Sequence, residues 1–263
     1  MTPQERRQVI LSELRKAGRI DVNELSEQLR CSKVTIRSDV RSLESEGLLM
    51  RTHGGAILPD EEKKTKYTYA SIYRNSQSKR EIAAAAFRLI NDRDIIFLDD
   101  SSTCFYLALK LKAHPEKHCA VITNSLLVGS EIAECAHLDV YIAGGQVSGN
   151  PPASMGERAE ARIGEVHMDK GFIGVYSINL GVGLTSVASP QMMIKRAVLK
   201  AADQVYVLAD SSKFGGGYIS VVCPVSEVTG IITDRGIDPE QVRTAQKMNV
   251  RLMVADQLRG EEG

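Results

Sequence analysis

Hydroxyl, amide, glycine and lysine residues recur directly after short apolar runs in the second half of the sequence. Hydroxyl groups and backbone N–H groups at the start of a helix, together with a lysine, are suited to bind a phosphate group. Ordinary helix caps and turns use the same residue types, so one such loop alone could be purely structural. Their recurrence after consecutive predicted strands favours a phosphate-binding site. The predicted site residues are Asp99, Ser101, Ser102, Thr103, Asn124, Ser125, Gly144, Gly145, Lys195 and Lys213.

A second group of residues, in the segment 32–45, is typical of a helix that contacts DNA. Ile36, Val40 and Leu43 recur at i, i+4 and i+7 and predict a short amphipathic helix that faces a core. Ser32 is predicted to cap the start of this helix. The opposite face carries Val34, Arg37, Ser38 and Arg41.

A β-hairpin is predicted directly after this helix. The apolar runs 48–50 and 56–58 flank a turn with two glycines, and the segment between them carries Arg51 and His53. A helix that exposes arginines, followed at once by a hairpin, is the layout of a winged helix-turn-helix DNA reader. The helix-turn-helix would occupy about residues 20–39. A small core helix with a solvated arginine face is the alternative interpretation.

Two helix-start signals upstream favour the DNA reader over that alternative. The segments 2–5 and 21–24 are capping boxes that open amphipathic helices. In this hypothesis Arg37 reaches guanine or a phosphate, Val34 contacts a thymine methyl, and other side chains hold the DNA backbone. Because one copy reads few base pairs, we expect a dimer or higher homo-oligomer on double-stranded DNA. The predicted DNA-contacting residues are Ser32, Lys33, Val34, Thr35, Arg37, Ser38, Arg41, Arg51 and His53.

These two sets of residues imply two domains joined by a linker. We expect a winged helix-turn-helix in residues 1–58, a linker in 59–78, and an α/β domain in 79–263. The linker is rich in charged residues and contains three tyrosines, which suggests some aromatic docking. From residue 79 onward, helical segments alternate with short apolar runs, which predicts a mostly parallel sheet covered on both faces. The expected strands are 95–98, 120–123, 140–143, 171–175, 205–209 and 230–233.

Composition narrows the class of protein. Lys and Arg together number 33, as do Asp and Glu, so the balanced charge argues against a protein that coats DNA without sequence preference. The five cysteines form no Cys-x-x-Cys pair, no signal peptide is recognised, and no apolar run is long enough to span a membrane. We therefore expect a soluble, cytoplasmic protein. His114, His118 and Cys119 lie close together, but Pro115 interrupts any helical ligand face, so we expect neither a metal nor a cofactor.

The sequence resembles the DeoR family of bacterial transcriptional regulators nearly from end to end. The segment 35–37 is one of the matching blocks, and the most specific are 51–56 and 210–214. The resemblance implies a winged helix-turn-helix followed by an α/β sensor domain that looks like ribose-5-phosphate isomerase. It further implies a repressor of sugar-catabolism genes that responds to a phosphorylated sugar effector.

Several positions depart from the family pattern, and four of them bear on the predicted function. Ser38 replaces a second arginine, and Asp100 adds a negative charge beside the predicted phosphate site, which is unfavourable unless it points away or pairs with a lysine. Tyr176 and Asn179 stand where the family carries two aspartates. An alternative function is a sugar-phosphate isomerase with an appended DNA module. That reaction needs a carboxylate base, which these two positions do not supply, although Asp99, Asp100 and Asp210 remain and keep the alternative open. A pure interaction scaffold, the third alternative, leaves the hydroxyl-rich loops unexplained, so we expect a regulator and not an enzyme.

Overall fold

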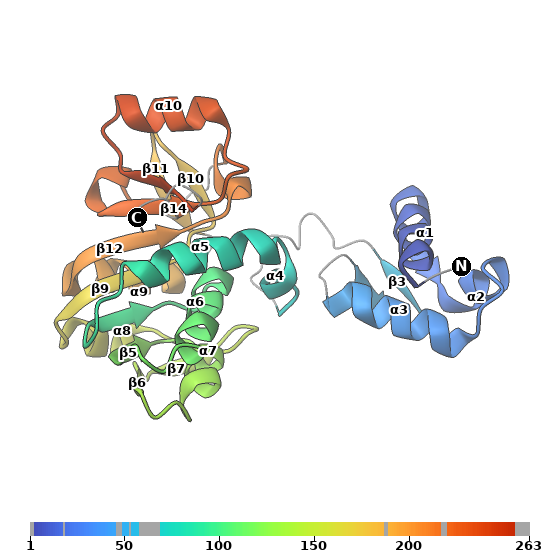
Figure 1. Cartoon of the computed structure of the whole chain (residues 1–263), viewed down its shortest axis with the longest axis horizontal. Coiled ribbons are helices and arrows are strands. Elements are labelled where there is room, and N and C mark those ends of the chain that lie inside the picture. The colour runs from blue at the N-terminus through green and yellow to red at the C-terminus, as the bar shows by residue number, and fades with distance from the viewer. Residues whose placement is uncertain are drawn as a thin grey trace. The chain divides into compact units, whose positions relative to one another are not determined.

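The computed structural model describes residues 3–17, 19–45, 49–52, 54–57, 69–186, 189–216 and 220–255 (Figure 1). The chain divides into two compact units, residues 1–74 and residues 75–263. Each unit has its own hydrophobic core and is described by itself.

The first unit contains a three-helix cluster and a small antiparallel sheet with the strand order β1-β3-β2. The predicted core face of the third helix is confirmed, because Ile36, Val40 and Leu43 are all buried. The predicted hairpin is confirmed as well, since β2 and β3 pair antiparallel. The strand β1 was not predicted. The elements are α1 (Pro3–Ala17), β1 (Arg19–Asp21), α2 (Val22–Gln28), α3 (Lys33–Ser45), β2 (Met50–Thr52), β3 (Gly55–Ile57) and α4 (Tyr69–Tyr73).

Short-range contacts explain the ends of these elements. Asp21 Oδ1 accepts a hydrogen bond from the backbone N–H of Asn23 at 2.6 Å, and so caps α2. Ser32 Oγ accepts from the N–H of Thr35 at 3.1 Å at the start of α3, as predicted. Gly55 lets β3 lie against β1, because a Cβ at this position would come within 2.0 Å of the carbonyl oxygen of Ile20. The strand β1, which the sequence does not strongly predict, thereby holds the hairpin and the predicted helix face together.

The second unit is built on a seven-stranded sheet with the order β15-β14-β12-β9-β4-β5-β6. Every neighbouring pair in it is parallel. All six predicted strands are present in this sheet, and β15 was missed. Its strands are β4 (Ile95–Leu98), β5 (Cys119–Thr123), β6 (Leu138–Ile142), β9 (Met168–Ile173), β12 (Ala202–Leu208), β14 (Gly230–Thr233) and β15 (Leu252–Val254).

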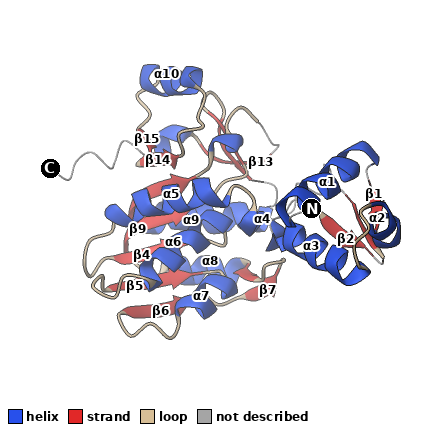
Figure 2. Cartoon of the chain, turned by 45° about the vertical axis from the view of Figure 1, so that its right-hand side comes forward, coloured by secondary structure: helices blue, strands red, loops and turns tan. Residues whose placement is uncertain are grey.

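Helices cover both faces of this sheet, as the apolar strands require. The helices α5, α6 and α7 form one layer, and α8 and α9 lie on the opposite face (Figure 2). The helices are α5 (Ser76–Arg88), α6 (Ser102–Lys112), α7 (Leu126–Ile132), α8 (Glu157–Gly164), α9 (Ser189–Ala201) and α10 (Pro239–Lys247). The fold class is therefore a helix-turn-helix unit followed by an α/β unit with a parallel sheet.

Two smaller sheets in the second unit were not predicted. One has the order β10-β11-β13, with β10 (Ser177–Asn179), β11 (Gly183–Ser186) and β13 (Ser220–Cys223). The other is the hairpin of β7 (Gln146–Ser148) and β8 (Ala153–Met155). The second half of the expected linker contains α4 and the start of α5, whereas residues 58–68 lie outside the described residues. Among the residues that the structure describes, no helix is long and apolar enough to cross a membrane.

Candidate functional site

The predicted DNA-contacting residues of α3 lie together on its solvent-facing side. Val34 is 75% exposed, and Arg37, Ser38 and Arg41 are exposed beside it. Single exposed apolar side chains are common on protein surfaces, so the exposure of Val34 fits a contact with a thymine methyl but does not by itself show one. The remaining predicted residues of this segment, Ser32, Lys33 and Thr35, surround the start of the helix. Arg51 lies on β2 with its side chain undescribed, and His53 lies outside the described residues.

A buried ion pair that the sequence analysis missed holds α3 against α1. The guanidinium Nε of Arg6 donates to Asp39 Oδ2, and that of Arg7 donates to Asp39 Oδ1 at 3.4 Å. Asp39 is 3% exposed, and its hydrogen bond raises the pKa of Arg6. An aspartate between two arginines, Arg37 and Arg41, in the middle of a helix was the available signal. This contact fixes the orientation of α3 against α1, and therefore the direction in which the exposed side chains of α3 point.

The predicted phosphate-binding loops lie at one edge of the seven-stranded sheet. Because all its strands are parallel, their carboxyl ends meet there. Leu98 of β4 pairs with Thr123 of β5, so the residues that follow them, Asp99 and Asn124, are neighbours. The other loops follow β6, β9 and β12 at the same edge, as predicted.

Two of the predicted hydroxyls act as ordinary helix caps. Ser101 Oγ accepts from the N–H of Cys104 at the start of α6, and Ser125 Oγ accepts from the N–H of Val128 at the start of α7, both at 3.2 Å. Thr103, in the first turn of α6, is 5% exposed. The two serine oxygens are thus already engaged as acceptors, and each hydroxyl keeps its proton to donate.

Lys195 of α9 is buried against Asp99. Its Nζ donates to Asp99 Oδ2 at 2.5 Å, and Asp99 also accepts from the backbone N–H groups of Gly174 at 2.8 Å and Ser101 at 2.9 Å. Burial would lower the pKa of Lys195, but the nearby carboxylates of Asp99 and Asp100 outweigh it and the pKa is raised. The positive charge of Lys195 is therefore balanced by carboxylates in the interior of the protein.

Asp100 is buried in the same cluster. Gln191 Nε2 donates to its Oδ2 at 3.1 Å. Burial raises the pKa of this carboxyl, and Lys195 opposes that rise only in part. Two carboxylates thus share one ammonium group, which leaves the cluster with an excess of negative charge when both are ionised.

Lys213 occupies a different position from Lys195. It is partly exposed on the loop after β12, and its Nζ lies 5.4 Å from the centroid of the Tyr176 ring, a cation–π contact. Ser177 Oγ donates to the carbonyl oxygen of Lys213 at 3.2 Å. Asn179 Oδ1 accepts from the N–H groups of Gly181 and Val182 and so closes the β10–β11 turn. Neither Tyr176 nor Asn179 brings a carboxylate to this edge.

Asn124 has a buried side-chain oxygen that accepts no hydrogen bond from the described residues. Its Nδ2 donates to the carbonyl oxygen of Ser154 at 3.3 Å, whereas its Oδ1 has no partner among the described residues. Buried acceptors are costly unless paired, so Oδ1 remains able to accept a hydrogen bond from a water molecule or a ligand. Gly145 near it has φ +108°, and a Cβ there would come within 2.8 Å of the carbonyl oxygen of Met155. Thr233 Oγ1, at the end of β14, is also buried without a described partner and was not predicted.

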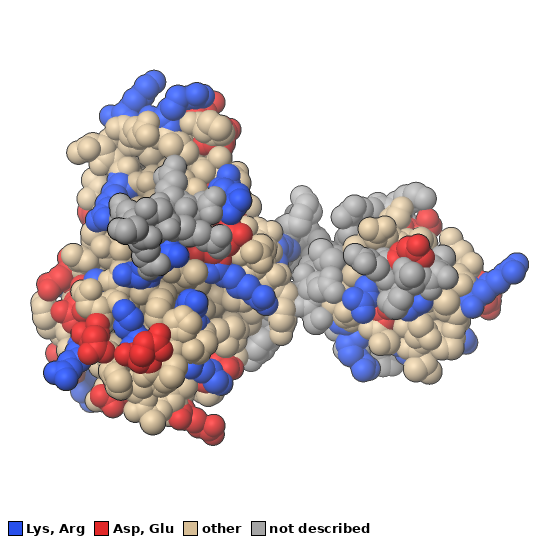
Figure 3. All heavy atoms as spheres, viewed as in Figure 1, with Lys and Arg blue, Asp and Glu red and all other residues tan. Residues whose placement is uncertain are grey.

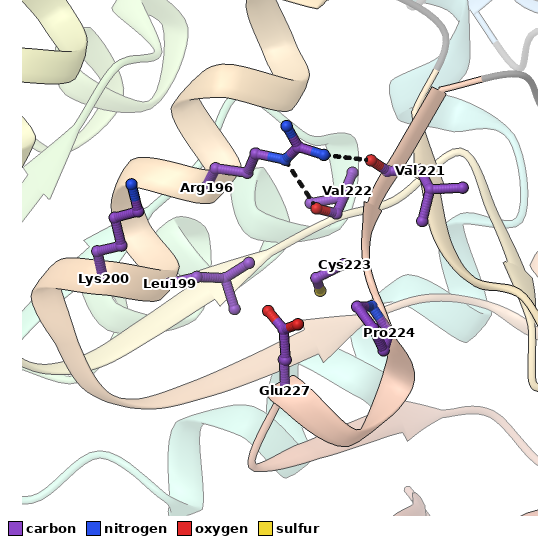
Figure 4. Close-up of a pocket in the computed structure, with 8 residues that line it drawn as sticks. All are labelled: Arg196, Leu199, Lys200, Val221, Val222, Cys223, Pro224 and Glu227. Atoms are coloured by element: carbon purple, nitrogen blue, oxygen red, sulfur yellow. Dashed lines mark hydrogen bonds between the residues drawn. The ribbon is translucent and has the colours of Figure 1, made fainter.

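A groove of about 380 Å³ lies away from this edge, between α9 and β13 (Figure 4). Arg196 Nε and Nη2 donate to the carbonyl oxygens of Val222 and Val221, each at 2.9 Å, and so occupy part of it. None of the predicted site residues lines it. On the face of the second unit shown in Figure 3, basic and acidic side chains are interspersed, without a dominant sign of charge.

Comparisons with known proteins identify both units. Residues 6–62 match the DeoR-like helix-turn-helix domain, and residues 74–235 match the DeoR C terminal sensor domain. The chain belongs to the DeoR family. It is a DNA-binding transcriptional regulator with a sensor domain, as the resemblance predicted.

Three relatives illustrate this membership of the DeoR family. The HTH-type transcriptional repressor GlcR of Bacillus subtilis is 30% identical over 100% of both chains. The lactose phosphotransferase system repressor of Lactococcus lactis is 30% identical over 92% of this chain and 95% of its own. The L-fucose operon activator of Haemophilus influenzae is 28% identical over 88% and 92%. Among solved structures, ribose 5-phosphate isomerase A of Methanocaldococcus jannaschii matches with a TM-score of 0.40 and 18% identity, covering 54% of this chain and 55% of that chain.

Proposed function

We propose that this DeoR-family regulator represses carbohydrate-catabolism genes and that a phosphorylated sugar controls it through the carboxyl edge of the sensor sheet. The buried, unpartnered Oδ1 of Asn124 carries the proposal, because it needs a donor and sugar hydroxyls are donors. The names of two relatives refer to the sugars lactose and fucose. One of these is a repressor and the other an activator, so the test must also show whether the effector weakens or strengthens operator binding.

The phosphate group would bind at the start of α6. The first N–H groups of a helix have no intrahelical partner and attract an anion. Ser102 and Thr103 supply such groups, and the loop leading to them lies beside Asn124. Ser125, Gly144 and Gly145 belong to the neighbouring loops at this edge and would contact the rest of the sugar.

Lys213 would supply the positive charge for this phosphate. Lys195 is 5% exposed and its ammonium is already paired with Asp99, so it would stabilise the site from within. Lys213 is more exposed, and a contact with the ring of Tyr176 is weaker than a charge-assisted hydrogen bond to phosphate. A phosphate would therefore be a stronger partner for this ammonium group than the ring is.

This proposal assigns binding without turnover. Isomerisation requires a carboxylate base close to the reacting carbon. Tyr176 cannot serve as one, and the side-chain oxygen of Asn179 accepts two backbone hydrogen bonds in a turn. Among the edge carboxylates, Asp99 is held by three donors, as described above.

On the DNA side, residues 1–58 would read an operator and residues 79–263 would sense the effector, with 59–78 joining them. Arg37 and Val34 would contact base edges, and Arg51 and His53 would contact the flanking backbone through the hairpin. A homodimer or higher oligomer would place two such units on repeated half-sites.

A thermal-shift panel tests the proposal. Ribose 5-phosphate, glucose 6-phosphate, fructose 6-phosphate and galactose 6-phosphate would each be compared with the unphosphorylated sugar and with inorganic phosphate. A ligand at one hundred times its Kd stabilises the native state by about 2.7 kcal/mol, a readily measured rise in melting temperature. The same ligand must change affinity for an operator selected from a random-sequence duplex library. A panel without a phosphate-dependent shift, or a shift without an effect on operator binding, would contradict the proposal.

A further inference from the structure

Asn75 occupies the junction between the two units and has an unusual conformation. It is the first residue of the second unit and directly precedes α5. Its φ and ψ are 52° and 35°, in the left-handed region that asparagine adopts more readily than other residues except glycine, but that is not the usual backbone of a helix cap. An asparagine at the start of a helix normally has an extended backbone and caps the helix with its own side chain. Here the side chain makes no capping hydrogen bond.

The side chain of Asn75 is instead bound to the loop that carries Lys213. Its Nδ2 donates to Asp210 Oδ1 at 3.0 Å and faces Ser212 Oγ at 3.4 Å. Asp210 is 3% exposed, and the same Oδ1 accepts from the N–H and the hydroxyl of Ser212. This contact joins residues 135 positions apart in the sequence. The first residue after the DNA-binding unit is thus tied to a loop of the proposed effector site.

We propose that Asn75 is a positioning residue that couples effector binding to the junction with the DNA-binding unit. This inference rests on the proposed function of the sensor edge. In one arrangement the amide of Asn75 binds Asp210 and Ser212, and the backbone is left-handed. In the other, the amide is released, Asn75 returns to an extended backbone, and its side chain caps α5.

An effector can favour the second arrangement through the loop itself. Lys213 follows Ser212 directly, and a phosphate that draws Lys213 away from Tyr176 moves the residues that accept from Asn75. A ligand shifts such an equilibrium only if it binds the two arrangements unequally, and the loop supplies that difference. Because the change occurs in the backbone dihedrals φ and ψ of a single residue, it alters the direction in which the chain enters α5. No contact between the two units is required.

Two substitutions at Asn75 separate the arrangements. Asn75→Gly removes the amide but suits a left-handed backbone, so the fold is kept and the coupling is lost. Asn75→Asp places a carboxylate against Asp210 and is a good helix cap, so it favours the released arrangement without a ligand. Asn249, with φ 55° and exposed after α10, offers matched controls in Asn249→Gly and Asn249→Asp.

The experiment measures operator affinity for these four variants and the parent, with and without saturating glucose 6-phosphate, ribose 5-phosphate or inorganic phosphate. We expect Asn75→Asp alone to shift operator affinity at least about fivefold relative to Asn249→Asp, in the direction that the active sugar phosphate produces in the parent. Asn75→Gly should bind that sugar phosphate with a parental Kd by calorimetry, while its operator affinity no longer responds. The Asn249 variants should behave like the parent.

Failure of the inference and failure of the proposed function give different results. If both Asn75 variants keep parental operator affinity and a parental response to the active sugar phosphate, the coupling role is overturned. If the parent binds none of the three probes, the proposed effector class is wrong. In that case the ligand-free comparison still decides, because a shift in Asn75→Asp but not in Asn249→Asp supports the coupling role and the absence of one overturns it.

Discussion

The substitution Asp99→Asn tests whether the buried cluster at the sheet edge stabilises the sensor unit. It removes the charge that balances Lys195 and weakens the acceptor used by Gly174 and Ser101. Both members of the ion pair are buried, with side-chain exposures of 0% for Asp99 and 6% for Lys195. Removing one partner of a buried pair costs about 3–5 kcal/mol.

The expected loss lies at the lower end of that range, because Asp100 also attracts Lys195 and offsets part of the lost charge. We expect a decrease of about 3 kcal/mol in the free energy of unfolding, out of a total of about 5–15 kcal/mol for a typical protein. At a urea dependence of about 2 kcal/mol/M, the midpoint would fall by about 1.5 M.

Urea titration followed by circular dichroism is the assay, since the chain has no tryptophan to report unfolding. Asp139→Asn, at an exposed position on β6, is the matched control and should leave the midpoint unchanged. The double variant Asp99→Asn with Lys195→Met removes both charges and should recover part of the loss. A loss below about 1 kcal/mol in Asp99→Asn would refute the reasoning, because it would mean that the buried pair contributes no more than a surface pair.

Three further substitutions test the remaining assignments. Arg37→Ala should weaken binding to the selected operator by about 1–3 kcal/mol and weaken binding to random DNA much less, measured by gel-shift titrations at several salt concentrations. Equal losses on both DNAs would mean that Arg37 contacts the DNA backbone and not a base. Lys213→Ala should weaken sugar-phosphate binding about tenfold or more in calorimetry, since a hydrogen bond to a charged group contributes about 1.5–3 kcal/mol. Operator binding without ligand should stay at the parental affinity. If the variant binds the sugar phosphate as tightly as the parent, the phosphate binds elsewhere. Lys195→Met should make stability fall as pH rises from acid to neutral. Burial already raises the pKa of Asp100, and the substitution removes the cation that opposes this rise, so the folded state binds the proton of Asp100 more tightly than the unfolded state does. Equal denaturation midpoints at pH 5 and pH 8 would contradict this.

Local patterns in the sequence predicted most of the fold. The spacing of Ile36, Val40 and Leu43 was enough to place the buried face of α3, because a helix repeats every 3.6 residues whatever it packs against. Runs of apolar residues predicted six of the seven strands of the main sheet, since a strand buried on both faces must be apolar throughout. The strands β1, β7, β8, β10, β11 and β13 were missed because they are three or four residues long and mix polar with apolar side chains. The strand β15 is apolar but only three residues long, which is too short to show a pattern.

The candidate site was predicted as a set of loops but not as a set of contacts. The parallel sheet brings the carboxyl ends of its strands to one edge, so the loops after β4, β5, β6, β9 and β12 could be grouped from the sequence. The sequence could not show that Lys195 pairs with Asp99 while Lys213 contacts Tyr176, because both lysines have the same chemistry. Their different roles follow from burial, which depends on how α9 and the loop after β12 pack.

By itself, then, the sequence determined the hairpin, six strands of the parallel sheet, the exposed face of α3 and the family. These depend on residue type and spacing over fewer than about fifteen neighbours, or on blocks such as 210–214 that match the family directly. Only the tertiary structure decided which distant side chains meet: Arg6 with Asp39, Lys195 with Asp99, and Asn75 with Asp210. Such pairs join residues far apart in the chain, and packing of whole elements brings them within hydrogen-bond distance. Buried polar groups must find partners, but many partners are chemically equivalent, so geometry alone makes the choice.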